Sequence, residues 1–169
     1  MSNKFNPFNN PKPAIYFIAG FIALAVVFLS CEAKAETQIE WGPTFASTNY
    51  SNGSALFFSE VFGEGKYLVG LGLIGDQSGD FNEGTITIKS NMLVHAQRLV
   101  TYKKVTLGLG VANWQHTNRM LGDEFTFSLS LSYRLGEHLD VRYRHFSNAG
   151  TASPNSGQDI LLIGYRFGK

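Results

Sequence analysis

Apolar and polar residues alternate with a period of two along much of the chain after residue 36. In residues 125–134, Phe, Leu and Tyr alternate with Thr, Ser and Arg over ten positions. Residues 105–112 and 67–73 repeat the pattern, with glycine at several of the polar positions. Successive side chains of a strand point to opposite faces, so this period is typical of strands with one apolar and one polar face. The pattern predicts an all-β protein.

Eight such strands are expected, and their connections alternate in length. The expected strands are 37–47, 54–62, 66–75, 85–99, 103–113, 124–134, 138–147 and 158–168. The short connections are 63–65, 100–102 and 135–137, and the longer ones are 49–53, 76–84, 114–123 and 148–158. Short turns at one end and longer loops at the other are typical of outer-membrane barrels. Eight strands enclose too narrow a space for a channel, which argues against a porin.

A soluble sandwich would bury the apolar faces, whereas a membrane barrel turns them outward to lipid. The strands are long enough to cross a hydrocarbon layer at a tilt. The polar faces also carry four arginines that a sandwich core would not accommodate: Arg134, Arg142, Arg144 and Arg166. We therefore expect an eight-stranded antiparallel transmembrane β-barrel.

The alternation does not determine which face of the second strand points inward, because both of its faces carry large apolar residues. Phe57 and Val61 alternate with Leu56, Phe58 and Phe62. A bare carboxylate on the lipid side is costly, so the position of Glu60 favours turning the even-numbered residues inward.

Residues 1–35 read as a signal peptide that precedes the barrel of residues 36–169. Lys4 and Lys12 give a positive start, residues 14–29 are uncharged and largely apolar, and residues 33–35 form the small-x-small pattern of a cleavage site. A retained membrane anchor is the alternative, although the apolar run is shorter than a typical span. A lipid-modified Cys31 is a further alternative, with a poorly matching lead-in.

Export would leave a nearly neutral chain without cysteine. Removal of three of the 14 basic and one of the 13 acidic residues leaves 11 and 12, and Cys31 is the single cysteine of the sequence. Neither disulfides nor thiolate metal sites are then available. No basic excess points to nucleic acid, and no metal-ligand or phosphate-binding motif implies a cofactor.

The seventh and eighth strands carry a candidate catalytic group. His145 and Ser147 share the apolar face of the seventh strand, and Asp159 begins the apolar face of the eighth. If the N-terminus starts in the periplasm, the seventh strand ends at the cell surface, and the three residues meet at the outer leaflet. A serine hydroxyl becomes a useful nucleophile when an imidazole takes its proton and a carboxylate orients the ring. This arrangement favours ester hydrolysis on a lipid.

The turn after Ser147 offers donors for a developing oxyanion. The backbone N–H groups near Ala149 and Gly150, together with the Asn148 side chain, are the expected oxyanion hole.

The segment 145–150, His-Phe-Ser-Asn-Ala-Gly, followed by Pro-Asn-Ser-Gly at 154–157 and an acidic residue at the start of the last strand, resembles the PagL-type outer-membrane lipid A 3-O-deacylases. The resemblance is strong over about the last 30 residues. It implies an eight-stranded barrel that removes the ester-linked hydroxyacyl chain from position 3 of lipid A, with Ser147 as nucleophile, His145 as base and Asn148 at the oxyanion. The family uses Glu where this chain has Asp159, so the shorter carboxylate must start closer to the ring or reach it through a water.

Three rival interpretations stay open from the sequence. They are a non-enzymatic barrel that binds partners through its loops, a barrel acyltransferase that adds a chain to lipid A, and, for the triad residues, a coincidence of surface polar groups. His95, His116 and His138 are expected in structural or solvated positions. The expected partners are lipid A and outer-membrane lipids, and homodimerisation is left open.

Overall fold

The structure is a computed structural model that describes residues 35–46, 53–81, 84–117, 120–153 and 157–168. The expected signal peptide, apart from residue 35, lies outside these ranges, as do Cys31 and residues 154–156 of the last long loop. Within the described ranges, no helix is long and apolar enough to cross a membrane.

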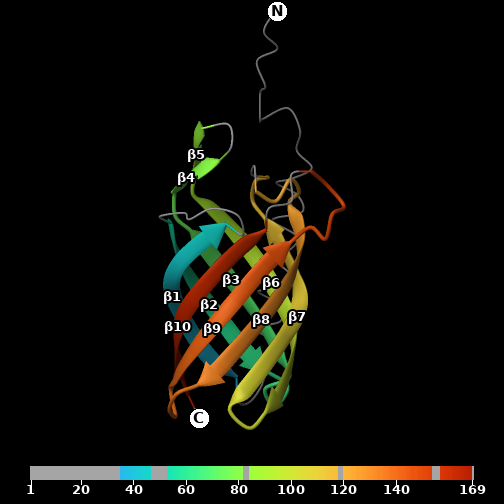
Figure 1. The fold of residues 1–169 in the computed structure, drawn as a ribbon. Coiled ribbons are helices and arrows are strands. Elements are labelled where there is room, and N and C mark those ends of the chain that lie inside the picture. Colours follow the sequence, from blue (N-terminus) through green and yellow to red (C-terminus); the bar gives the residue numbers. More distant parts are fainter. Residues whose placement is uncertain (1–34, 47–52, 82–83, 118–119, 154–156, 169) are drawn as a thin grey trace, which may run out of the picture.

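Eight antiparallel strands close into a barrel, which confirms the expected fold class (Figure 1). Around the barrel the order is β1, β10, β9, β8, β7, β6, β3 and β2, and β1 pairs with β2 to close it. The barrel strands are β1 (Glu36–Ala46), β2 (Gly53–Phe62), β3 (Tyr67–Ile74), β6 (Asn91–Tyr102), β7 (Val105–Trp114), β8 (Phe125–Arg134), β9 (Leu139–Ser147) and β10 (Gln158–Phe167). We call the end with residues 63–66, 103–104 and 135–138 the turn end, and the opposite end the loop end.

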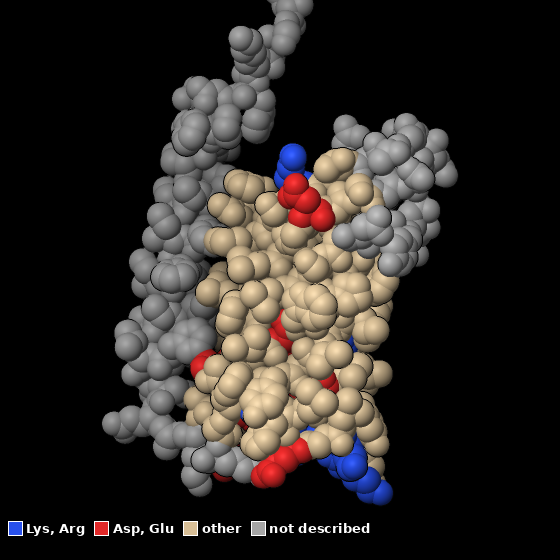
Figure 2. All heavy atoms as spheres, turned by 90° about the vertical axis from the view of Figure 1, so that its left-hand side faces the viewer, with Lys and Arg blue, Asp and Glu red and all other residues tan. Residues whose placement is uncertain are grey.

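The outer surface of the barrel is apolar, as the alternation predicts. On β8 every odd-numbered residue is exposed, and the even-numbered Thr126, Ser128, Ser130 and Ser132 are buried. β9 and β10 repeat this arrangement. On the face shown in Figure 2, the middle is largely uncharged and most charged side chains lie near the two ends. This distribution suits a barrel whose waist contacts hydrocarbon.

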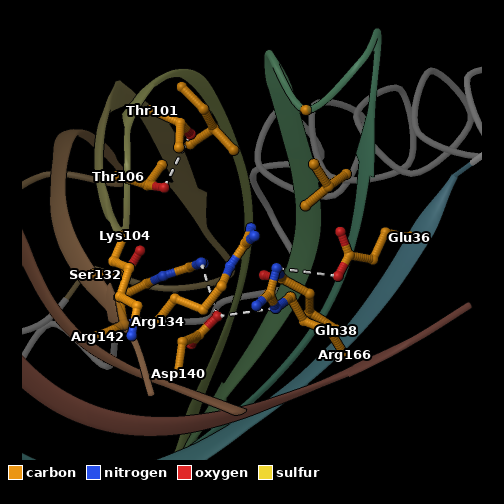
Figure 3. Close-up of a pocket in the computed structure, with 13 residues that line it drawn as sticks. Glu36, Gln38, Thr101, Lys104, Thr106, Ser132, Arg134, Asp140, Arg142 and Arg166 are labelled. Atoms are coloured by element: carbon orange, nitrogen blue, oxygen red, sulfur yellow. Dashed lines mark hydrogen bonds and ion pairs between the residues drawn. The ribbon is translucent and has the colours of Figure 1, made fainter. Parts of the chain in front are cut away.

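The interior is filled by charged pairs rather than left as a channel. Glu40 lies between two arginines, with Oε1 2.9 Å from Nη1 of Arg142 and Oε2 2.8 Å from Nη2 of Arg144. Nearer the turn end, Nε of Arg166 is 3.5 Å from Oδ2 of Asp140 (Figure 3). These two acidic and three basic side chains are all buried. A small polar cavity of about 60 Å³ lies beside Asp140 and Arg166. Three of the four arginines expected to face inward, Arg142, Arg144 and Arg166, are thus paired with carboxylates, whereas Arg134 is exposed at the turn end of β8.

The prediction that the even-numbered residues of the second strand face inward is wrong. On β2 the odd-numbered Ala55, Phe57, Ser59 and Val61 are buried, and Glu60 faces outward. Phe57 is wholly buried and packs under the Arg144 guanidinium at 4.2 Å. Glu60 is tolerated outside because it lies near the turn end, where the Thr37 hydroxyl donates a hydrogen bond of 2.6 Å to it. The Phe57 ring therefore fills part of the interior, and the Glu60 carboxylate is hydrogen-bonded to Thr37 at the turn end of the barrel.

The region after β3 also differs from the prediction. The expected fourth strand at 85–99 divides into a separate element and a barrel strand. β4 (Gln77–Phe81) and β5 (Gly84–Ile88) form a two-stranded hairpin that projects from the loop end (Figure 1). The barrel strand β6 then extends through Tyr102, so the expected turn 100–102 lies within a strand and the turn itself falls at residues 103–104.

Candidate active site

β9 and β10 bring two of the expected site residues face to face. β9 alternates along its length so that His145 and Ser147 lie on its outward face with Leu139, Val141 and Tyr143. In the antiparallel register of β10 against β9, Asp159 is directly opposite His145. Side chains at opposed positions start about 5 Å apart at Cβ, which brings a short side chain within reach. The pair lies at the loop end of the barrel.

Asp159 contacts the imidazole directly, without an intervening water. Oδ1 of Asp159 is 2.6 Å from Nδ1 of His145, and the two side chains are 16% and 31% exposed. An ionised carboxylate only accepts hydrogen bonds, so this contact places a proton on Nδ1 and leaves Nε2 of a neutral ring as the basic nitrogen. The shorter side chain of Asp therefore reaches the ring because the two residues are paired across the strands.

A third side chain reaches the same carboxylate oxygen, and the sequence alone did not single it out for this role. The Tyr143 hydroxyl donates a hydrogen bond of 2.6 Å to Oδ1 of Asp159. Tyr143 lies two residues before His145, so both side chains leave the same face of β9. Only the cross-strand register, which the sequence does not state, reveals this contact.

Ser147 ends β9 and is followed at once by a tight turn with unusual backbone angles. Ala149 and Gly150 have φ of 55° and 81°, and the Thr151 N–H donates to the Asn148 carbonyl at 3.1 Å. These angles define a two-residue turn that favours glycine and is strained for alanine. The turn directs the Ala149 N–H to Oγ of Ser147 at 3.0 Å. The N–H is therefore held beside the hydroxyl of the candidate nucleophile.

The Asn148 side chain lies among the loops that follow β7 and β9. It is fully buried, and its amide nitrogen donates to the carbonyls of Leu121 and, at 2.8 Å, Ala152. Its Oδ1 accepts the Gly150 N–H at 2.9 Å. In the structure this side chain joins the loops around the site. A direct contribution of the Asn148 side chain to an oxyanion hole stays a prediction.

An apolar groove runs along the outer surface beside His145 and Ser147. It has a volume of about 390 Å³ and crosses β7, β8 and the end of β9. Its lining residues are Leu109, Gly110, Val111, Phe127, Ser128, Leu129, His145 and Ser147. Phe127 is paired with Ser147 and Leu129 with His145 across the strands. The two polar residues therefore border a surface suited to a hydrocarbon chain.

Gly157, just before β10, has no side chain, and the His145 imidazole occupies the space where one would lie. A Cβ at this position would lie 2.8 Å from Cε1 of His145, and the backbone has φ of 72°. We expect Gly157→Ala to displace the ring and lower the rate of ester hydrolysis about tenfold, because small displacements of a catalytic group are costly. The measurement is the rate of ester hydrolysis by the folded barrel of each variant.

Gly65→Ala is the matched control for that prediction. Gly65 has φ of 80° in the turn after β2, and an added Cβ there would meet nothing within 4 Å. Both variants therefore introduce similar backbone strain, and only Gly157→Ala adds a contact with His145. Equal rates for the two variants would show that the contact is unimportant.

A second serine and histidine meet inside the barrel. Oγ of Ser59 and Nε2 of His95 are 3.4 Å apart, and both residues are buried. Nη1 of Arg144 also lies 3.4 Å from Nε2 of His95, and the ring packs edge-on against Phe57. Neither Ser59 nor His95 borders the outer groove. We interpret this pair as part of the packed interior, where His95 was expected.

No cation site accompanies the outer groove. Among the described residues, no group of three or more His, Cys, Asp or Glu side chains is placed to hold a metal ion.

Comparisons with known proteins found one matching family model and similar solved structures. The family model of the lipid A 3-O-deacylase PagL matches residues 32–167. Among solved structures, the outer membrane enzyme PagL aligns with a TM-score of 0.47 at 15% identity, over 79% of this chain and 99% of that one. The Yersinia pestis outer membrane protein Ail, solved in a phospholipid bilayer nanodisc, aligns with a TM-score of 0.43 at 15% identity, over 79% of this chain and 100% of that one. No curated protein sequence matches the chain.

Proposed function

The chain belongs to the PagL family of lipid A 3-O-deacylases, and from that premise we propose that it hydrolyses the 3-O-linked hydroxyacyl ester of lipid A in the outer membrane. The family match extends over nearly all of the barrel, and the barrel is an outer-membrane type with an apolar exterior. The activity of this particular chain and the roles of its residues are the parts that we propose.

One observation carries the proposal more than any other. The 2.6 Å contact between His145 and Asp159 lies on the outward face of the barrel, two residues from Ser147 and at the border of an apolar groove. A carboxylate and an imidazole are expensive to expose to lipid without a role. An esterase that acts on a membrane lipid needs these groups where acyl chains lie.

The proposed reaction has two steps. Oγ of Ser147 attacks the ester carbonyl while Nε2 of His145 takes the hydroxyl proton, and Asp159 stabilises the resulting imidazolium. The tetrahedral intermediate then collapses, the bond to the sugar oxygen breaks, and His145 returns the proton to that oxygen. Water, activated by the same imidazole, hydrolyses the acyl-serine and releases a 3-hydroxy fatty acid.

We assign the negative oxygen of the intermediate to the Ala149 N–H in the turn 148–150, because the Gly150 N–H already donates to Oδ1 of Asn148. The Ala149 N–H contacts Oγ of Ser147 in the resting structure and belongs to the residue two positions after the nucleophile. The conformation of the turn at Ala149 and Gly150 fixes the direction of the Ala149 N–H before substrate arrives. Fixed donors lower the barrier because they need not reorient as charge develops.

The substrate geometry follows from the groove and from the usual orientation of such barrels. With short turns in the periplasm, the loop end of the barrel lies at the outer leaflet, where lipid A resides. We propose that the scissile acyl chain lies in the groove against Leu109, Val111 and Phe127, and that the sugar lies toward the loops above Ser147.

Mass spectrometry of lipid A tests the proposal. Cells that express the chain are compared with cells that express Ser147→Ala at equal outer-membrane abundance. We expect loss of one 3-hydroxyacyl mass from lipid A in the first strain and full-length lipid A in the second. A gain of acyl mass would instead identify an acyltransferase. Unchanged lipid A in both strains would refute the deacylase assignment.

A further inference from the structure

Asp159 receives two hydrogen bonds on one oxygen, and only one of them comes from the expected catalytic group. Nδ1 of His145 and the hydroxyl of Tyr143 both lie 2.6 Å from Oδ1. Tyr143 is the diagonal neighbour of Asp159 across the strands, since its direct partner on β10 is Leu161. A diagonal pair lies farther apart than a direct pair, and only a long side chain such as tyrosine closes the distance.

This second contact answers a physical difficulty of the site. Asp159 faces outward from a membrane barrel, beside apolar residues such as Leu161, so its charge is poorly solvated. When His145 is neutral, its single Nδ1–H is one donor to that carboxylate. The Tyr143 hydroxyl is a second hydrogen-bond donor to the same carboxylate, and this donor carries no charge.

We propose that Tyr143 is a positioning residue of the esterase site, which holds the Asp159 carboxylate aimed at Nδ1 of His145. The inference rests on the proposed function of Ser147, His145 and Asp159. Tyr143 does not touch the reacting atoms in this role, and it acts through Asp159. With the carboxylate anchored from one side, the short Asp side chain keeps the ring in the tautomer and orientation that Ser147 requires.

Removal of the hydroxyl is the direct test. We expect Tyr143→Phe to lower kcat for release of the 3-hydroxy fatty acid about 5- to 10-fold, with KM nearly unchanged, because the ring and its apolar contact with lipid remain. Tyr133→Phe is the control. Tyr133 faces outward from the neighbouring strand β8 with similar exposure, and no side-chain hydrogen bond of its hydroxyl is found in the described part of the chain. Equal kcat values for Tyr143→Phe and Tyr133→Phe would overturn the proposal.

A double-mutant cycle separates positioning from general packing. If Tyr143 acts through the Asp159 carboxylate, Tyr143→Phe has no further effect on the residual activity of Asp159→Ala. If Tyr143 instead supports the barrel or contacts substrate by itself, the two losses multiply. If the two losses multiply, the role assigned to Tyr143 is contradicted, even if Tyr143→Phe alone lowers kcat.

A spectroscopic measurement distinguishes failure of this inference from failure of the proposed function. In the folded barrel with Ser147→Ala and ¹⁵N-labelled histidine, the Nδ1 proton of His145 is observed by NMR and assigned by its loss in His145→Gln. We expect Tyr143→Phe to shift or broaden this resonance and Tyr133→Phe to leave it unchanged. An unmoved resonance refutes the positioning role. A wild-type barrel that releases no hydroxy acid, but whose resonance moves in Tyr143→Phe, refutes the esterase alone.

Discussion

Replacing Ser147 with alanine is expected to reduce lipid A deacylation by about 10³-fold or more while leaving the barrel folded. The substitution removes the oxygen that forms the acyl intermediate, and neither His145 nor a bound water replaces it at the same position. Ser147 is only partly buried at the end of β9, so loss of its hydroxyl does not open a cavity in the interior. The measurement is release of 3-hydroxy fatty acid by the purified barrel in detergent, with heat-modifiable migration as the measure of folding.

Ser54→Ala is the matched control for this prediction. Ser54 is also an outward-facing serine near the loop end, on β2, and it does not border the groove at His145. We expect Ser54→Ala to retain activity within about twofold, as surface substitutions commonly do. Residual activity of Ser147→Ala within tenfold of wild type would exclude Ser147 as the nucleophile.

The strands around the site could be predicted because their alternation has no competing explanation. β8 carries an apolar residue at every odd position and a small or polar one at every even position, so its faces are determined by the sequence. The same regularity placed His145, Ser147 and Asp159 on outward faces, which the structure confirms. That Asp159 lies opposite His145 depends on the register of β10 against β9, which strand periodicity does not determine.

The inward face of β2 was predicted wrongly, because the position of Glu60 in the sequence favoured the opposite orientation. Glu60 is costly in hydrocarbon, but its place near the turn end and the Thr37 hydroxyl remove most of that cost. The inward place of Phe57 follows from its contacts with Arg144, Phe146 and His95, which lie on distant parts of the chain. Packing of the interior therefore outweighed the charge rule.

The side-chain partners at the site show the same limit. Asn148 follows the candidate nucleophile in sequence, which suggested a role at the oxyanion, yet its amide is bonded to Leu121 in another loop. Tyr143 reads as an aromatic residue of the membrane surface until β10 is placed beside it. The faces of the regularly alternating strands follow from the sequence, whereas the face of β2 and the contacts between strands and loops require the closed barrel.

The largest expected effect on stability comes from Glu40, which lies inside the barrel, whereas the proposed esterase site lies on its outer surface. Glu40 is fully buried between Arg142 and Arg144, with ion-pair distances of 2.9 and 2.8 Å. Glu40→Gln keeps the shape of the side chain but leaves two buried guanidinium groups without their shared anion. Removal of one partner from a buried charge pair typically costs about 3–5 kcal/mol. We expect a loss of this size in the free energy of unfolding.

Urea-induced unfolding of the barrel in lipid vesicles measures this loss, from the shift in midpoint at constant slope. Glu64→Gln is the control, because Glu64 forms an exposed pair with Lys66 at 3.0 Å in the turn after β2. Exposed pairs contribute about 0–1 kcal/mol, so this variant should unfold close to wild type. Similar midpoints for the two variants would mean that water or rearranged neighbours compensate the two arginines. The interior would then be a solvated space rather than a network whose charges must be paired for β1 and β9 to stay in place.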